Sequence, residues 1–203
     1  MYLTKIEMPL TERAVRAALS DCQKMHRLVM GLFDAKRQEA GVLYRARTKD
    51  GRVALYLYSD VPIIESSVFP WMNLVGQREV SAWLDNMRTG KMCRFDLLAM
   101  PSKKVAAEGR KNSQRRLLRT LEERMTWLER KGEQNGFSVL SVQELEGIHL
   151  TGNHAEESGG NMNWDAYHYN GVLEITDEEA FRRGVSDGIG PGKAYGLGML
   201  LLF

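Results

Sequence analysis

The residues with the clearest chemical potential lie in a glycine-rich segment, Gly188–Leu200, which surrounds one cation, Lys193. Its first glycines, Gly188, Gly190 and Gly192, alternate with other residues. Glycine is favoured where the backbone needs a positive φ or where another group must approach it closely. Unhindered N–H groups beside a lysine can bind a phosphate. The segment therefore predicts either a phosphate-binding loop or an ordinary long turn before a final strand.

The spacing of this segment excludes two familiar phosphate-binding motifs. The P-loop requires Gly, four residues and then Gly-Lys-Ser/Thr, but Asp187 stands five positions before Gly192, and Ala194 follows Lys193. The dinucleotide motif Gly-x-Gly-x-x-Gly fails from either of the first two glycines, and it opens a helix after a strand. The segment is therefore neither a nucleoside-triphosphate site nor a Rossmann turn.

Four histidines could exchange protons near neutral pH. His26 lies at the edge of the apolar face of an expected helix, where a half-buried structural role is more common than a functional one. His149, His154 and His168 fit no zinc-ligand spacing, and no cysteine or carboxylate is placed to complete a site. The sequence therefore predicts neither a metal nor a cofactor.

Positive charge is concentrated in one segment of the chain. Residues 103–119 contain seven cations and one acid, Glu108, which gives +6; the whole chain carries +2, so the remaining residues together carry −4. A local patch of this kind favours binding of a polyanion, with a solvated charged loop as the alternative. Its cations are Lys103, Lys104, Arg110, Lys111, Arg115, Arg116 and Arg119.

The overall composition is that of an ordinary globular protein of one large or two small cores. Of the 203 residues, 43% are hydrophobic and 27% are charged. No apolar run approaches the roughly 20 residues of a membrane span, and the N-terminus lacks a signal-peptide pattern. Cys22 and Cys93 are too few for a disulfide framework. We therefore expect a cytoplasmic protein with no membrane partner.

The first half has the pattern of a split βαβ unit. Its expected elements are a strand at Tyr2–Met8, a helix capped by Thr11 that runs to about Phe33, and strands at Gly41–Arg47 and Arg52–Ser59. Asp50-Gly51 between the last two strands indicates a hairpin. A short helix at Ile63–Met72 and a strand through Val80–Leu84 would complete the unit, although a helix is also compatible with the latter stretch.

The second half repeats this order. Its expected elements are a strand at Lys91–Met100, a helix from about Gln114 to Lys131, strands at Ser138–Leu150 and Tyr167–Thr176, a helix at Asp177–Ser186 capped by Thr176, and a last strand to Phe203. The fold class is therefore α+β, with two tandem ferredoxin-like (RRM-like, βαββαβ) domains at residues 1–90 and 91–203.

Four segments carry a resemblance to a known family. They are Met1–Lys5, Phe95–Lys104, Gly171–Thr176 and, above all, Gly188–Leu200. Together with the expected tandem fold, they closely resemble the CasE-type CRISPR endoribonucleases, the crRNA-processing subunits of the type I-E Cascade complex. The resemblance covers the whole chain.

This resemblance implies an activity. CasE-type enzymes cut CRISPR repeat RNA at the base of its hairpin without a metal, by attack of the 2′-hydroxyl, and retain the product within Cascade. Their helix histidine corresponds to His26, and Lys193 is our candidate for the cation that stabilises the phosphorane. Lys24, Arg27, the first three glycines of the C-terminal segment and the basic residues other than Arg119 are the expected RNA contacts.

Two positions depart from the family pattern. The family often carries a tyrosine one turn before the histidine, where this chain has Gln23, and an amide cannot usefully transfer a proton. The family's Ala-Asn-Pro reads Ala-Met-Pro here, with Met100 in place of the asparagine. His26 would then act with Lys193, Lys24 or Arg27. A non-catalytic module of the same fold that binds RNA hairpins is the alternative function.

Overall fold

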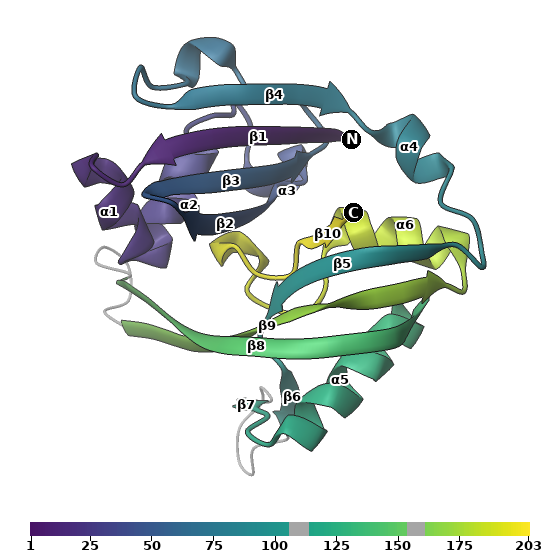
Figure 1. Ribbon diagram of the computed structural model, residues 1–203. Coiled ribbons are helices and arrows are strands. Elements are labelled where there is room, and N and C mark those ends of the chain that lie inside the picture. The colour runs from purple at the N-terminus through teal and green to yellow at the C-terminus, as the bar shows by residue number, and fades with distance from the viewer. Residues whose placement is uncertain (106–113, 154–160) are drawn as a thin grey trace.

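The first half of the chain forms an antiparallel sheet. The structure is a computed structural model and describes residues 1–105, 114–153 and 161–203. The sheet has the order β2-β3-β1-β4 (Figure 1). Its strands are β1 (Tyr2–Pro9), β2 (Leu43–Lys49), β3 (Arg52–Ser59) and β4 (Asn73–Glu79). The expected hairpin is confirmed, because Asp50 and Gly51 have φ of 51° and 74°, as a two-residue turn between twisted strands requires.

The second half forms a sheet of the same topology. Its strands are β5 (Met92–Ala99), β8 (Phe137–Asn153), β9 (Asn161–Ile175) and β10 (Leu200–Leu202), in the order β10-β5-β9-β8. Numbered in chain order within its own half, each sheet reads 4-1-3-2, and every pairing is antiparallel. This is the strand order of a split βαβ fold. The prediction of two tandem ferredoxin-like folds is confirmed.

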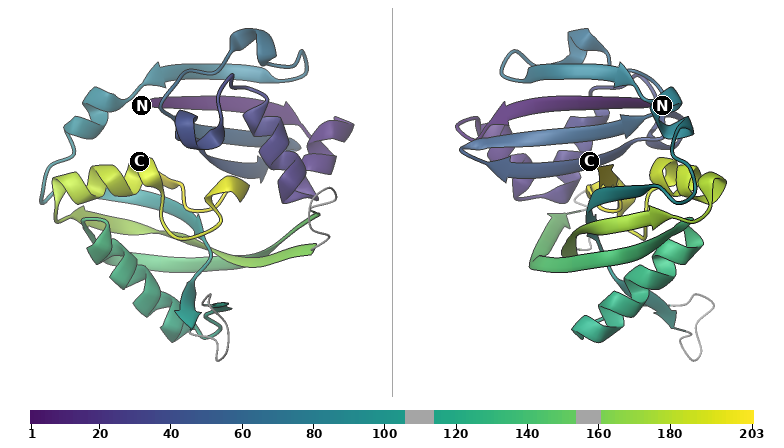
Figure 2. Two further views of the ribbon diagram at one scale, coloured as in Figure 1. Left: turned by 180° about the vertical axis from the view of Figure 1, so that it is seen from behind. Right: turned by 45° about the vertical axis from the view of Figure 1, so that its right-hand side comes forward.

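Most of the helices lie against one face of a sheet. They are α1 (Arg13–Leu19), α2 (Cys22–Met30), α3 (Arg37–Ala40), α4 (Ser81–Asp85), α5 (Leu121–Gln134) and α6 (Glu178–Asp187), with 3₁₀ turns η1 (Glu65–Ser67) and η2 (Lys193–Tyr195). Seen from behind, α1, α2 and α3 lie in front of the first sheet (Figure 2). No helix in the described ranges is long and apolar enough to cross a membrane.

The single helix expected from Thr11 to Phe33 is wrong, because the chain forms two helices there. Asp21 has an extended backbone (φ −147°, ψ 109°), and its carboxylate accepts hydrogen bonds from the amides of Gln23 and Lys24. This side chain satisfies donors that a helix start leaves free, and so it begins α2 anew. At the start of α1 the N-cap residue is Glu12, not Thr11, and its side chain makes no capping bond.

The region from residue 63 to 85 also differs from expectation. Only the three residues of η1 are helical where a helix was expected at Ile63–Met72. At Val80–Leu84 the chain forms α4, which is the helix that the sequence also allowed, and not a strand. The fourth strand of the first sheet is β4, which begins seven residues before the expected start at Val80. Since β4 lies at the sheet edge and is mostly exposed along its length, its sequence carries no apolar alternation.

Both helices of the second half begin later than predicted. Residues 114–117 form β7, which pairs with β6 (Ser102–Val105), and α5 starts only at Leu121. Thr120 and Glu123 form a reciprocal capping box that sets this start, and Leu121, the first residue of the helix, is 56% exposed. The cap of α6 is Asp177 rather than Thr176, because its carboxylate accepts the amide of Ala180.

The hydrophobic core joins the two halves. One buried cluster lies between the first sheet and its helices and includes Ile6, Met25 and Leu55. A larger cluster contains Trp127 and Phe181 from the helices of the second half, and it extends to residues of β2 and β3 on the opposite face of the first sheet. The C-terminal segment lies between the sheets (Figure 1). The second half therefore packs directly on β2 of the first sheet.

A buried carboxylate links the sheets where they face each other. Asp96 of β5 is 2% exposed and lies 3.6 Å from Arg45 and 3.5 Å from Arg47, both on β2. His168 of β9 is 2.7 Å from the same carboxylate. Burial raises the pKa of Asp96, but the His168 hydrogen bond and the Arg45 charge outweigh burial and hold that pKa below its usual value. His168 is therefore a structural residue.

The cap of α2 generates a prediction about stability. Asp21→Ala removes the acceptor of two amides at the start of the helix that carries His26. We expect the free energy of unfolding to fall by about 1 kcal/mol, measured by urea denaturation. Asp85→Ala, at an exposed aspartate on α4, is the control. Equal stabilities of the two variants would show that the Asp21 cap does not hold α2.

Candidate functional site

The glycine-rich loop runs from Gly188 to Met199, between α6 and β10, and its backbone can be formed only by glycine at key positions. Gly190 and Gly192 have φ of 82° and 83°, in the left-handed region. A Cβ on Gly192 would lie 2.5 Å from the Trp164 ring, and one on Gly190 would lie 3.1 Å from Trp127. The two indole rings therefore support the loop from within and fix its path.

The outer side of the loop offers free hydrogen-bond donors. Within the described residues, the amides of Gly190, Gly192, Lys193 and Ala194 donate no hydrogen bond. Consecutive free amides that follow a left-handed residue form a concavity that suits an anion. Of the two interpretations of this segment, a phosphate-binding loop thus has the geometry it needs.

His26 lies against this loop. Its ring meets the Tyr195 ring edge-on at 6.0 Å between centroids, and Tyr195 in turn meets Trp164 at 4.9 Å. The ring is half-buried, and its Nδ1 is buried with no hydrogen-bond partner among the described residues. Burial and then the charge of Arg37 lower the pKa of His26, against an opposing contribution from the backbone of Ala194. The imidazole is therefore neutral near pH 7.

Lys193 follows directly after Gly192 and is also half-buried. Burial lowers its pKa, and Arg37 lowers it further, while Asp187 acts in the opposite direction. His26 and Lys193 thus both lie within the electrostatic reach of one guanidinium. The structure brings these two predicted residues to the same region although 167 positions separate them in the sequence.

Two further residues of this region, Arg37 and Tyr44, were missed from the sequence. Arg37 on α3 is half-buried, and its Nε has no partner among the described residues. The hydroxyl of the buried Tyr44 and Oε1 of Gln23 are likewise buried without a partner there. Burial raises the pKa of Tyr44 far above its usual value, so its phenol is neutral. No motif surrounds Arg37 or Tyr44 that could have indicated them.

A basic cavity of about 630 Å³ continues from the loop. It lies between β6 and β7, the C-terminal end of α5 and the loop, and Asp187 is the one acid among the described residues that line it. Burial lowers the pKa of Lys131, with Arg130, Lys193 and Arg115 adding to the effect. The cations that line the cavity are Lys103, Lys104, Arg115, Arg130, Lys131 and Lys193, and the predicted loop glycines that line it are Gly188 and Gly190.

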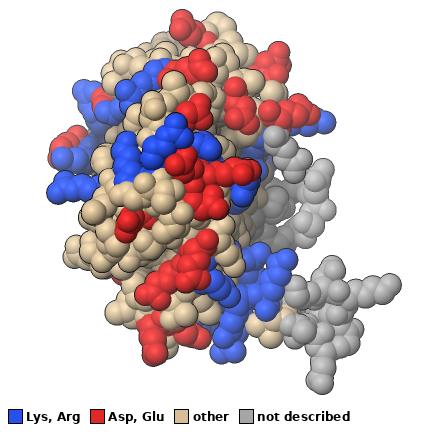
Figure 3. Space-filling view, turned by 90° about the vertical axis from the view of Figure 1, so that its right-hand side faces the viewer, with Lys and Arg blue, Asp and Glu red and all other residues tan. Residues whose placement is uncertain are grey.

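Only some of the predicted RNA contacts therefore line this cavity. Arg116 is exposed on β7 opposite Lys103, outside the cavity lining. Lys24 and Arg27 are exposed on α2, away from the cavity, although the Arg27 charge contributes to the lowered pKa of His26. Arg110 and Lys111 lie outside the described residues, as does His154. Figure 3 shows Lys and Arg side chains gathered beside the lower grey region, next to β6 and β7.

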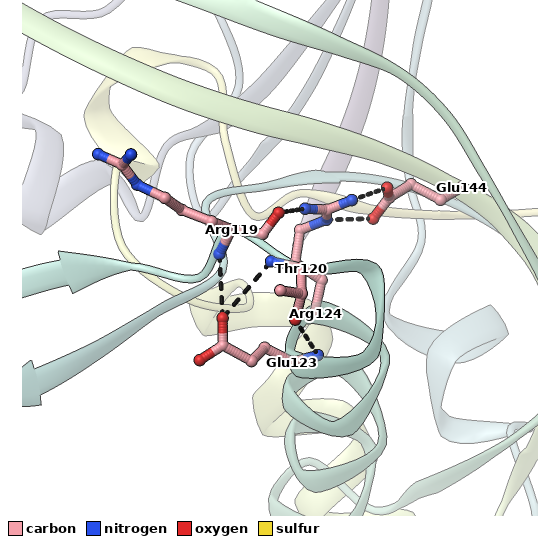
Figure 4. A network of polar contacts seen from close by, with 5 residues as sticks. All are labelled: Arg119, Thr120, Glu123, Arg124 and Glu144. Carbon is pink, nitrogen blue, oxygen red and sulfur yellow. Dashed lines mark hydrogen bonds and ion pairs between the residues drawn. The ribbon is translucent and has the colours of Figure 1, made fainter.

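A polar network holds the end of β7 onto the second sheet (Figure 4). Arg124 of α5 donates to both carboxylate oxygens of Glu144, at 2.8 and 2.5 Å, and to the carbonyl of Arg119 at 2.6 Å. Its guanidinium also lies 4.0 Å from the centroid of the Tyr167 ring. A bidentate, charge-assisted pair of this kind is geometrically specific. The network therefore fixes the direction in which β6 and β7 leave the body of the protein.

The two other described histidines, His149 and His168, are not placed for chemistry. His149 pairs with Asp165 at 2.6 Å on the exposed surface of β8 and β9, and His168 is held by Asp96. In the described ranges, no group of three or more His, Cys, Asp or Glu side chains could hold a metal ion.

Comparisons with known proteins fit this arrangement. The chain is 29% identical to the CRISPR-associated endoribonuclease Cse3 of Thermus thermophilus, over 98% of each chain. It is similar to the structure of CRISPR endoribonuclease Cse3 bound to 19 nt RNA, with a TM-score of 0.86, 28% identity and full coverage of both chains. A chain of a CRISPR RNA-guided surveillance complex, pre-nicking, matches with a TM-score of 0.76 and 25% identity, over all of this chain and 99% of that one.

A family model described as CRISPR associated protein matches residues 1–203. The chain therefore belongs to this family of CRISPR-associated proteins.

Proposed function

We propose that this protein is an endoribonuclease that cuts CRISPR repeat RNA at the base of its hairpin and stays bound to the product as a subunit of a Cascade-type complex. The observation that carries the proposal is His26, whose buried Nδ1 has no hydrogen-bond partner among the described residues and whose ring lies against a loop of free amides at the end of a basic cavity. The relatives described as an endoribonuclease bound to RNA and as part of a surveillance complex support it.

Each half of the chain contributes different parts of the proposed site. Residues 1–90 supply the helix that bears His26, and residues 91–203 supply the basic strands β6 and β7 and the glycine-rich loop. RNA phosphates would follow the cavity from β6 and β7 to Lys193, because cations outnumber acids among the described residues that line it. Both cysteines are buried free thiols, which suits the reducing cytoplasm.

The reaction needs only proton transfer and charge stabilisation. The 2′-oxygen of the ribose attacks phosphorus and gives up its proton, the bond from phosphorus to O5′ breaks, and O5′ takes up a proton. The products are a 2′,3′-cyclic phosphate and a 5′-hydroxyl. A neutral His26 can accept the 2′-hydroxyl proton, and Lys193 with the loop amides stabilises the charge on the phosphorane oxygens.

A non-catalytic RNA-binding module remains the second candidate. The observation in its favour is Gln23, one turn before His26, because an amide cannot act as an acid or a base. Cleavage of a cognate repeat RNA by the wild-type protein in EDTA would eliminate this candidate.

His26→Ala should abolish cleavage while leaving RNA binding intact. We expect the single-turnover rate in EDTA to fall by about 100-fold or more, because the proton acceptor is lost, and the dissociation constant to change little. His149→Ala, at an exposed histidine, is the matched control and should cleave normally. Normal cleavage by His26→Ala would remove this residue from the mechanism.

The pH dependence of cleavage follows from the lowered pKa of His26. The groups around the ring are Arg37 from α3, Arg27 on its own helix, and the Ala194 backbone with the Tyr195 ring from the loop. Since the folded-state pKa lies below the usual value of about 6.5, the neutral base persists to lower pH. The rate should stay level from pH 8 to about 6.5 and decline below it. A decline centred above that value contradicts a neutral base at this position.

The cations of β7 should determine salt dependence. Arg115→Ala combined with Arg116→Ala removes two phosphate contacts, so RNA affinity should weaken and the slope of log affinity against log salt should become shallower by about 1.5. Lys49→Ala with Arg52→Ala removes the same charge from the β2–β3 hairpin and serves as the control. An unchanged slope in the Arg115 and Arg116 variant would place the RNA on another surface.

A further inference from the structure

Arg37 is a cation without a counterion among the described residues. It is half-buried, its Nε is buried with no hydrogen-bond partner, and it forms no ion pair in the described part of the chain. Burial accordingly lowers its pKa from the usual value. A charged group taken out of water destabilises the fold unless a partner compensates for it.

Arg124 on α5 is an arginine of this protein whose guanidinium does have hydrogen-bond partners, and it serves as a comparison. Arg124 is 8% exposed, and it donates to both oxygens of Glu144 and to a backbone carbonyl. Arg37 has no corresponding carboxylate or carbonyl among the described residues. Its place in the fold is therefore not explained by a role in holding α3.

The groups near Arg37 add to the local excess of positive charge. The Arg37 charge lowers the pKa of both His26 and Lys193, so three basic groups share this region. The buried hydroxyl of Tyr44 faces the same region, and its phenol is neutral. A concentration of cations and unpartnered donors leaves one chemical class of ligand, an anion with several acceptor oxygens.

We propose that Arg37 is a catalytic residue that donates hydrogen bonds to the non-bridging oxygens of the scissile phosphate. This proposal rests on the proposed endoribonuclease function. While the 2′-oxygen bonds to phosphorus and the bond to O5′ breaks, negative charge grows on the two non-bridging oxygens. The planar guanidinium fork can contact both oxygens at once, whereas the ammonium of Lys193 is a point charge.

Arg37 has a second effect in the same step. Its positive charge disfavours the imidazolium form of His26 and so keeps the base neutral before reaction. When phosphate oxygens neutralise this charge, the imidazole becomes better able to accept the 2′-hydroxyl proton. One guanidinium thus couples substrate binding to the basicity of His26.

The test compares Arg37→Ala, Arg37→Lys and wild-type protein on a cognate repeat RNA, with Arg13→Ala as the control at an exposed arginine of α1. We expect Arg37→Ala to lower the single-turnover rate by about 100-fold and to weaken RNA binding by less than about 10-fold. Arg37→Lys should recover part of the rate. In Arg37→Ala, the acidic limb of the pH profile should move to higher pH, because the charge that lowers the His26 pKa is gone.

Two further measurements separate a catalytic role from a structural one. Sulfur at one non-bridging oxygen of the scissile phosphate should slow the wild-type enzyme more than Arg37→Ala. Added guanidinium ion at low millimolar concentration should restore cleavage to Arg37→Ala but not to His26→Ala.

Several results would overturn the proposed role of Arg37. Wild-type rates in Arg37→Ala, or equal sulfur effects in the two proteins, would overturn the role of Arg37 while leaving the endoribonuclease intact. If Arg37→Ala fails to fold, Arg37→Lys decides: a wild-type rate and an unchanged sulfur effect overturn the proposal. No cleavage by the wild-type protein refutes the proposed function itself.

Discussion

The close packing of the glycine-rich loop against the first half of the chain is the constraint on which the site depends. A Cβ on Gly196 would lie 2.9 Å from the ring of Tyr44, and one on Gly188 would lie 2.9 Å from the side chain of Leu43, so side chains of β2 pack directly on the backbone of the loop. Larger residues would push the loop away from α2 and separate Lys193 from His26. The site therefore exists only where the two ferredoxin-like folds pack on each other.

The same packing gives the site its electrostatic character. Charges between the sheets are compensated, as Asp96 is by Arg45 and Arg47, and the buried arginine of α5 has its own carboxylate. Around the loop, Arg37 and Lys193 form no ion pair among the described residues, which destabilises the free protein. Residues that reduce stability in this way are typical of functional sites, where a ligand supplies the missing interaction.

Much of the fold could be predicted from the sequence because its signals are local. The Asp50-Gly51 turn and the strand expected at Tyr2–Met8 depend on neighbouring residues, and both are present. Thr120 and Glu123 carried a capping signal that would have placed the start of α5 correctly. By contrast, β4 has no local pattern, since its strand conformation comes from pairing with β1 at the sheet edge.

The residues of the candidate site likewise differ in whether the local sequence could indicate them. The loop glycines and Lys193 were visible as a motif, and the role of His26 came from a family resemblance rather than from its position. Arg37 and Tyr44 could not have been found, because only tertiary packing brings α3 and β2 to the loop. The cavity likewise adds Arg130 and Lys131, which in the sequence look like ordinary charges on a solvated helix face.

The central claim is that α2 of the first half and the glycine-rich loop of the second half hold one phosphodiester between them. The most direct measurement is a crystal structure of the protein with its repeat RNA carrying a 2′-deoxy ribose at the cut, which prevents reaction without removing the phosphate. The account predicts that the scissile phosphate lies within hydrogen-bonding distance of the loop amides, with the His26 ring beside the 2′ position. A scissile phosphate bound elsewhere on the protein, with this region empty, would contradict it.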